Sequence, residues 1–227
     1  MNRHNVQQGF TLVELLIALV LSIVIILAML RAFAITGKVT AESSVGAQLD
    51  GSLMLGLVAT DRILQGIGFD VDSPKIKFFA GNESDASEWL IWNISAERCQ
   101  ALYNFKDKTK AKDDGLYLIG AETGFECEPE SLDKPEDVED LPEVQPLIII
   151  NRALENAEIA NNGNKIGRLS LSLISLSASQ KCLPFGVQYD ASQIGGKYEV
   201  LISANAYAGS VNEPRTLKNV TCLYNLR

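Results

Sequence analysis

The sequence has almost no histidine and few aromatic residues. The only histidine among its 227 residues is His4, close to the start. Ser-His-Asp triads, Cys-His pairs and zinc sites with histidine ligands all need this side chain, so we expect none of them in the body of the chain. The sequence also lacks a glycine-rich phosphate loop and a Gly-x-Ser-x-Gly motif. These absences predict a protein that is not an enzyme and holds neither a cofactor nor a metal.

An excess of basic residues is also missing. The formal net charge is −8 and the pI is about 4.8, which argues against a surface that holds nucleic acid along its whole length. A hydrophobic content of 47% and a mean hydropathy of +0.08 exclude a disordered chain. The length suits one ordinary domain with an additional segment.

Negative charge is concentrated in one segment, residues 126–146. Nine acidic residues against Lys134 give a net of 9 − 1 = 8 negative charges, the whole formal charge. The acidic residues are Glu126, Glu128, Glu130, Asp133, Glu136, Asp137, Glu139, Asp140 and Glu143. With four prolines, the segment is expected to be an extended, exposed loop. The segment is compatible with a solvated loop, a calcium site or a docking surface for a basic partner. Its acidic residues do not have the spacing of a calcium-binding loop.

A long apolar run occupies residues 10–30. Glu14 is its only charge, and Arg31 follows at once. The run is long enough to cross a bilayer as a helix. A secretory signal carries its cleavage site after the apolar run, whereas here the polar segment 1–9, ending in Gly9, precedes it.

The motif Gly9-Phe10-Thr11-Leu12-Val13-Glu14 resembles the start of type IV pilins and pseudopilins. The resemblance implies that a prepilin peptidase cuts after Gly9 and N-methylates Phe10, and that the apolar helix remains as an anchor. It also implies that Glu14 pairs with the amino terminus of a neighbouring subunit and sets the axial register. A carboxylate within an apolar run is costly to place in a membrane, so a cationic partner would stabilise it. The alternative is an ordinary membrane anchor in which Glu14 reaches the interface.

The helical pattern continues past Arg31. Apolar residues recur every three or four positions, at Val45, Leu49, Leu53, Leu57, Leu64 and Ile67. This predicts one helix from Phe10 to about Ile67, roughly 85 Å long, whose part from 31 to 68 is amphipathic and stops at Gly66 and Gly68. Each of Gly37, Gly46, Gly51 and Gly56 either permits close packing or bending, or is simply tolerated.

The end of this predicted helix resembles that of PilW-type minor pilins. These place an aspartate–arginine pair late in the helix, as in Asp61-Arg62, before an exit of small and aromatic residues, as in Gly66-Ile67-Gly68-Phe69. The J-type pseudopilin of type II secretion has a similar helix end. On local grounds alone, Asp61 and Arg62 equally fit a solvated helix face.

From residue 72 to 227 the pattern becomes alternating and predicts an antiparallel sheet laid on the helix, which makes an α+β head. The predicted strands are Trp89–Asn93, Leu116–Ile119, Leu147–Asn151, Leu169–Ser177, Phe185–Tyr189, Tyr198–Tyr207 and Thr216–Tyr224. In the fourth strand, the apolar phase shifts at Ile174, which predicts a bulge. Five aromatic residues at strand spacing fit a core better than a stacking surface for a ligand or DNA: Trp89, Trp92, Tyr103, Phe105 and Tyr117.

The four cysteines show no Cys-x-x-Cys motif. A head that follows this kind of anchor lies in the periplasm or outside the cell, where disulfides persist. Of the three possible pairings we favour Cys99–Cys127 with Cys182–Cys222, because each closes a local loop. Four free buried thiols are the alternative.

The resemblance implies a PilW-type minor pilin, anchored in the inner membrane before assembly, that helps prime a type IV pilus and stays at or near its tip. The implied partners are other minor pilins, the major pilin and the prepilin peptidase, with twitching, adhesion and DNA uptake downstream. Nothing in the sequence supports a DNA or surface ligand. A J-type pseudopilin and a single-pass periplasmic receptor or enzyme are the alternatives.

Overall fold

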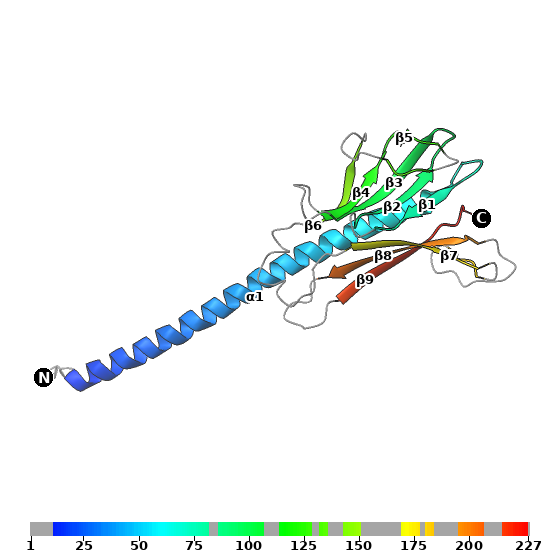
Figure 1. Ribbon diagram of the computed structural model, residues 1–227. Coiled ribbons are helices and arrows are strands. Elements are labelled where there is room, and N and C mark those ends of the chain that lie inside the picture. Colours follow the sequence, from blue (N-terminus) through cyan, green and yellow to red (C-terminus); the bar gives the residue numbers. More distant parts are fainter. Residues whose placement is uncertain are drawn as a thin grey trace, which may run out of the picture. The chain divides into compact units, whose positions relative to one another are not determined.

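The computed structural model describes residues 11–81, 86–106, 114–128, 132–135, 143–150, 169–177, 180–183, 195–206 and 215–226. Its chain divides into two compact units, Met1–Val45 and Gly46–Arg227. Helix α1 (Leu12–Gly66) begins in the first unit and ends in the second (Figure 1). The strands form two antiparallel sheets, so the α+β class predicted from the sequence is confirmed, with two sheets in place of one.

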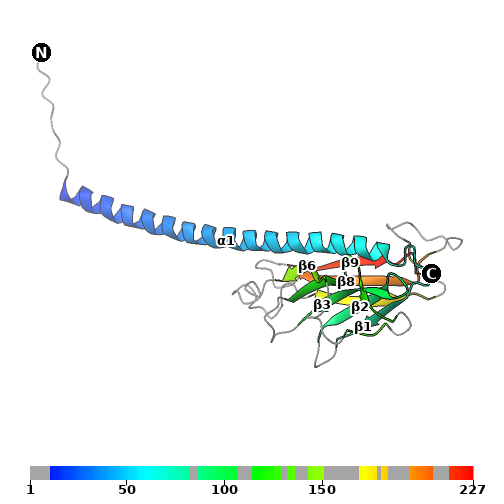
Figure 2. The same cartoon turned by 90° about the horizontal axis from the view of Figure 1, so that it is seen from above.

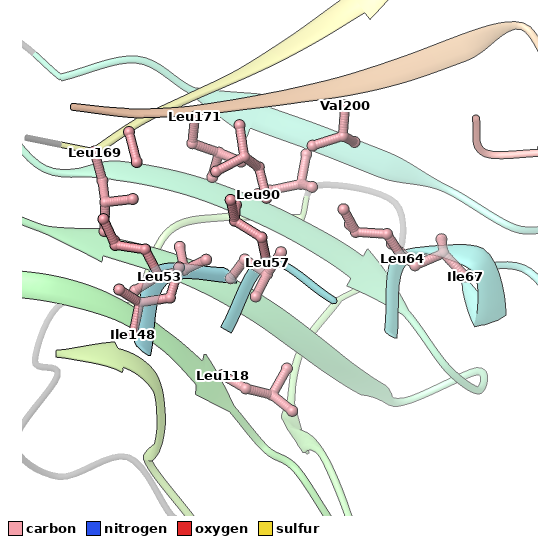
Figure 3. Close-up of a cluster of buried hydrophobic side chains, with 14 of the residues drawn as sticks. Leu53, Leu57, Leu64, Ile67, Leu90, Leu118, Ile148, Leu169, Leu171 and Val200 are labelled. Atoms are coloured by element: carbon pink, nitrogen blue, oxygen red, sulfur yellow. The ribbon is translucent and has the colours of Figure 1, made fainter. Parts of the chain in front are cut away.

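Within the second unit, one face of α1 is buried. Leu49, Leu53, Leu57, Leu64 and Ile67 recur at the predicted spacing and belong to one core cluster with residues of both sheets (Figure 3). Leu53 and Leu64 have no exposed side-chain surface at all. Figure 2 shows the strands of both sheets on one side of this part of the helix. Burial of this apolar face is what holds the helix on the sheets.

The first sheet has the order β1-β2-β3-β4-β6, with β5 paired to β3. Its strands are β1 (Ile76–Phe79), β2 (Glu88–Asn93), β3 (Arg98–Phe105), β4 (Asp114–Ile119), β5 (Phe125–Glu126) and β6 (Gln145–Ile150). Residues such as Leu90 and Leu102 face α1 on the inner face, whereas Trp89 and Tyr103 lie on the outer face. Both faces are therefore apolar, as in a sheet covered on two sides.

The second sheet consists of β7 (Leu169–Ser175), β8 (Tyr198–Ala206) and β9 (Arg215–Cys222). The bulge predicted at Ile174 is wrong, because β7 pairs with β8 in unbroken register from Leu169 to Ser175. Ile174 lies on the side of the sheet away from the core and is 40% exposed. The register shift falls instead in β4, between Leu116 and Tyr117. The predicted strand Phe185–Tyr189 lies outside the described residues.

Side chains of the first sheet bond to the free edge of β7. The Glu88 carboxylate accepts a hydrogen bond from the Leu171 amide at 2.7 Å, and the Asn104 amide donates to the Leu169 carbonyl at 3.2 Å. Asn104 also donates to Glu88 at 2.8 Å, and Lys106 forms an ion pair with Glu88 at 2.8 Å. These contacts join the two sheets and satisfy edge groups that would otherwise be open to another strand.

The outer face of the first sheet is covered by part of the acidic segment. We call the described residues 126–128, 132–135 and 143–144 the acidic cover. Leu132 is only 3% exposed and packs in the cluster with Trp89 and Tyr103, joined by Cys127 and Val144 at its margin. The prediction of a wholly exposed loop is therefore wrong at Leu132, because the apolar outer face needs a cover. The carboxylates of Glu126, Glu128, Asp133 and Glu143 remain exposed as predicted.

Glu143 binds the turn that follows β4. Its carboxylate accepts hydrogen bonds from the backbone amides of Glu122 at 2.8 Å and Thr123 at 3.1 Å. These two amides hold the pKa of Glu143 below its ordinary value of 4.5. The same turn carries Gly120 and Gly124, both in the left-handed region of φ.

The C-terminal end of α1 is closed by residues that follow β9. The Asn225 side-chain amide donates to the carbonyls of Gln65 at 3.3 Å and Ile67 at 3.1 Å. These are carbonyls that lack partners within a helix. Gly68 has φ of 77°, and a Cβ there would lie 3.1 Å from Pro74 and 3.2 Å from Asn225. The positive φ of Gly68 lets the chain turn away from the helix next to Asn225. This agrees with the helix end that the sequence predicts at Gly66 and Gly68.

Both predicted disulfides are confirmed. Cys99–Cys127 joins β3 to the acidic cover, and Cys182–Cys222 joins β9 to the segment before β8. The four cysteines are therefore all paired.

Candidate functional site

The first turn of α1 holds the single acidic residue of the apolar run. The carboxylate of Glu14 accepts hydrogen bonds from the backbone amide of Thr11 at 3.1 Å and from its hydroxyl at 3.0 Å. The Glu14 amide donates back to the Thr11 hydroxyl at 3.3 Å. This reciprocal arrangement is a capping box, which satisfies the free amides of the first turn. Glu14 is therefore fixed at the start of the helix by its own chain.

The predicted processing site adjoins this turn in the sequence. Gly9 and Phe10 lie outside the described residues, so cleavage after Gly9 and methylation of Phe10 stay predictions. Thr11 was missed as a site residue, although the spacing Thr-x-x-Glu in front of an apolar run is a sequence signal for a capping box.

The apolar side chains of α1 between Leu12 and Val39 are exposed within the described chain. The helix is long and apolar enough to cross a membrane, and none of its most apolar window is buried. An exposed apolar surface of this extent marks a membrane or protein interface rather than a surface that faces water.

A second exposed apolar surface lies on α1 within the second unit. Met54, Leu55 and Val58 are 55–75% exposed, outside the face of the helix that buries Leu53 and Leu57. We call these three residues the outward stripe. Gly51, also exposed, lies one turn before Leu55, and nothing lies within 4 Å of a Cβ placed on it. The helix thus offers apolar surface on the side that the head does not cover.

Asp61 and Arg62 have different surroundings. Asp61 accepts a hydrogen bond of 2.5 Å from the Thr221 hydroxyl of β9 and one of 2.7 Å from the Gln65 amide. Arg62 is exposed. The interpretation of both residues as a solvated helix face is therefore wrong for Asp61, which joins α1 to the second sheet, and holds for Arg62.

The aromatic residues of the first sheet are core residues, as predicted. Trp89, Tyr103, Phe105 and Tyr117 are buried on its outer face, and Trp92 is buried on its inner face. Among the described residues, no group of three or more histidine, cysteine, aspartate or glutamate side chains could hold a metal ion. Glu130, Glu136, Asp137, Glu139 and Asp140 lie outside the described residues.

Comparison with known families concerns the start of the chain. Residues 4–30 carry the prokaryotic N-terminal methylation motif. This motif is the prepilin signal of type IV pilin-like proteins, and it supports a place for the chain among type IV pilins and pseudopilins. It covers the capping box, Gly9 and Phe10, and most of the exposed apolar helix. No curated protein and no solved structure matches the chain.

The motif and the helix together fit anchoring in the inner membrane and incorporation into a pilus. They favour a structural protein over an enzyme. They also favour other pilins and the prepilin peptidase as partners in general.

Proposed function

We propose that this protein is a minor type IV pilin of the PilW kind, which helps prime filament assembly and stays at or near the tip. The observation that carries the proposal is the order of features at the N-terminus. A prepilin motif is followed by an exposed apolar helix with one carboxylate fixed in its first turn. A prepilin motif in front of the apolar helix favours a filament subunit over a single-pass receptor or enzyme with a conventional signal anchor.

Glu14 is suited to pair with a cationic group of a neighbouring subunit. Both hydrogen bonds from Thr11 go to Oε2 of the carboxylate, and no donor from the described residues contacts Oε1. The methylated terminal amine of a neighbour would bind Oε1 and form an ion pair in an apolar surrounding. Such a pair is strong where water is excluded. Thr11 keeps the carboxylate oriented until the neighbour arrives.

The apolar surfaces of α1 supply the remaining binding energy. In the membrane, lipid covers the side chains from Leu12 to Val39, and in the filament the helices of other subunits replace the lipid. The outward stripe would pack in the same way against a neighbouring helix. The head then selects the partners, as a minor pilin requires.

The proposal of the PilW kind rests on the resemblance of Asp61-Arg62, near the end of α1, to the family pair. The J-type pseudopilin has a similar helix end, so the second test below separates the two. The two disulfides support a head in an oxidising compartment, which for an inner-membrane anchor is the periplasm.

The first test is intact-mass analysis of the membrane-extracted chain from cells with and without prepilin peptidase. We expect a chain that begins at Phe10 and carries one methyl group, formed only when the peptidase is present. A chain that keeps residues 1–9, or is cut after the apolar run, would overturn the proposal in favour of a single-pass receptor or enzyme.

The second test separates the pilus from type II secretion. Deletion of the gene should remove surface pili and twitching while secretion of exported enzymes continues. Loss of secretion with intact pili would instead identify a J-type pseudopilin.

A further inference from the structure

The two edges of the second sheet differ in how they are covered. At the β7 edge, side chains of the first sheet bond to the backbone, Glu88 to the Leu171 amide and Asn104 to the Leu169 carbonyl. The other edge is β9, because the strand order is β7-β8-β9 (Figure 1). Its eight residues, Arg215–Cys222, include no proline, a residue that would hinder the addition of another strand.

The register of β9 shows which of its backbone groups point away from β8. The Leu223 amide donates to the Tyr198 carbonyl at 2.9 Å, and in an antiparallel pair such bonds recur at every second residue. The odd-numbered residues of β9 therefore bond to β8. The amides and carbonyls of Thr216, Lys218 and Val220 point to the free edge. None of the three forms a backbone hydrogen bond there with a residue that the structure describes. We call these three residues the open edge.

Helix α1 runs beside β9 in the same direction (Figure 2). The Thr221 hydroxyl donates to Asp61, and farther along both segments the Asn225 side chain donates to the Gln65 carbonyl at 3.3 Å. The residues that precede Thr221 in β9 therefore lie alongside the helix residues that precede Asp61.

Two residues of the outward stripe lie on this side of the helix. Val58 and Met54 precede Asp61 by three and seven positions, a spacing that places all three on one side of a helix. Met54 is 57% exposed and Val58 is 55% exposed, so β9 does not cover them. A further strand would lie about 4.8 Å beyond β9, next to these two side chains. Leu55, the third residue of the stripe, lies farther around the helix and remains available to a neighbouring helix.

The charges beside the open edge are basic, although the whole chain is acidic. Lys218 is exposed on β9, and Arg62 is exposed on α1 one turn after Val58. Neither side chain forms an ion pair with another residue in the described part of the chain. The sequence of β9 contains no acidic residue. Charge complementarity therefore favours an acidic segment over a basic one at this place.

We propose that the open edge binds an extended, acidic segment of a neighbouring subunit, which adds to the second sheet as a fourth strand. Alternate side chains of the segment are apolar and cover Met54 and Val58. The side chains between them include an acidic residue beside Lys218. The backbone bonds supply affinity, and the pattern of side chains supplies specificity. The inference rests on the proposed function for the source of the strand, a second filament subunit.

The experiment uses the full chain in detergent micelles and a synthetic peptide of eight residues, the length of β9, in which valine alternates with glutamate. Hydrogen exchange of single amides is followed by NMR. At millimolar peptide, we expect exchange at Thr216, Lys218 and Val220 to slow by at least about 5-fold, because each amide is then paired or shielded. The amides of Leu217 and Asn219, which already bond to β8, should change less. A peptide with lysine in place of glutamate should bind at least about 5-fold more weakly.

Variants of the chain separate the edge from the helix. Val220→Pro removes a donor that points away from β8, so it should weaken peptide binding about 10-fold without breaking a bond between β8 and β9. Met54→Glu/Val58→Glu should weaken binding by a similar factor, and it decides the matter if the proline variant does not fold. The control is Ile174→Glu, which replaces a 40% exposed apolar side chain on the face of the sheet away from α1 and should leave binding unchanged.

Three results would overturn the proposal. The first is unchanged exchange at the open edge with millimolar peptide, and the second is equal binding of the glutamate and lysine peptides. The third is protection of the open edge that rises with protein concentration alone, which would make a second copy of this chain the occupant. The peptide experiment needs no filament, so its failure is distinct from a failure of prepilin processing. An uncut chain would remove the neighbouring pilin as the source of the strand and leave the peptide result unaffected.

Discussion

At the scale of single residues, Gly56 shows how closely α1 approaches the first sheet. A Cβ at this position would lie 2.2 Å from Cγ1 of Ile148 and 2.6 Å from the Leu147 carbonyl oxygen. The Ile148 side chain could rotate, but the carbonyl belongs to the backbone of β6 and cannot give way without moving the strand. Of the two interpretations of this glycine, close packing is therefore correct. At Gly37 and Gly51, by contrast, nothing lies within 4 Å of the added atom.

Gly56→Ala and Gly51→Ala should change stability in opposite directions. Overpacking costs about 1–3 kcal/mol, which outweighs the gain in helix propensity, so Gly56→Ala should lower the free energy of unfolding by about 1–2 kcal/mol. Gly51→Ala should raise it by about 0.5–1 kcal/mol. Urea unfolding followed by tryptophan fluorescence measures both. Equal effects of the two substitutions would contradict the close approach of β6.

Thr221→Val tests the bond between β9 and Asp61. Valine keeps the shape of the side chain but removes the donor, and it leaves a carboxylate oxygen of Asp61 without this partner. We expect a loss of about 1–3 kcal/mol in the free energy of unfolding. Thr216→Val, at an exposed position of the same strand, is the control and should change stability by less than about 0.5 kcal/mol.

Glu143 predicts a pH dependence of stability. Because the folded state lowers the pKa of this carboxyl below 4.5, its contribution is present above that pH and is lost as the pH falls through the folded pKa. Glu143→Gln resembles the protonated form, so it should lower the urea midpoint at neutral pH. The difference from the unmodified protein should shrink well below pH 4.5. A difference that persists at acid pH would show that the charge is not the cause, and Glu126→Gln serves as the exposed control.

At the scale of elements, the contacts of Glu88 decide how the two sheets meet. This carboxylate bonds to Leu171, 83 positions away in the sequence, and also to Asn104 and Lys106. It therefore supplies, from a side chain, the acceptor that a neighbouring strand would supply to the edge of β7. The two sheets therefore dock through a side-chain carboxylate, which takes the place that the backbone of a further strand would have.

Glu88→Ala should loosen the second sheet from the first. It leaves the Leu171 amide and the Lys106 ammonium without their acceptor, and a hydrogen bond to a charged group contributes about 1.5–3 kcal/mol. We expect a lower urea midpoint and faster hydrogen exchange in β7. Glu97→Ala, in the exposed turn before β3, should leave both unchanged, and unchanged exchange in β7 for Glu88→Ala would refute the edge role.

Periodicity predicted α1 and the majority of the long strands, because each buries one face. It failed for β3, whose sequence has little polar alternation because both of its faces are covered, and for β1 and β5, which are very short. The capping box was readable from Thr11 and Glu14, since its residues are three positions apart. The contacts of Glu88 and Asn225 could not be predicted in this way, because their partners are distant in the sequence and only the folded chain brings them together.

At the scale of the whole molecule, the charge in the apolar helix opposes membrane insertion and, in the proposed function, favours assembly. A carboxylate in the centre of a membrane helix costs roughly 2.5–3.5 kcal/mol, and less nearer the interface. Glu14 therefore opposes insertion while it caps the first turn of the helix, and in the proposed function it also pairs with a neighbouring subunit.

Glu14→Leu should insert at least as well as the unmodified chain but fail to enter filaments. Membrane fractionation measures insertion, and the amount of the chain in sheared pili measures assembly. The control is Ser22→Leu, which also replaces a polar side chain of the same helix; the Ser22 hydroxyl bonds only within the helix, to the Ala18 carbonyl at 2.8 Å. This variant should assemble normally, and equal loss in both variants would argue against a specific role of Glu14.

The end of α1 is closed by residues that the ribosome adds much later. The bonds from Thr221 to Asp61 and from Asn225 to Gln65 each span 160 positions. At 5–20 residues per second, synthesis of that stretch takes about 8–32 s. During this time the nascent head lacks the bonds from Thr221 and Asn225 to the end of α1. The apolar face of α1 is also not yet covered by β8 and β9. A chaperone that binds apolar helix surfaces would have this interval in which to act.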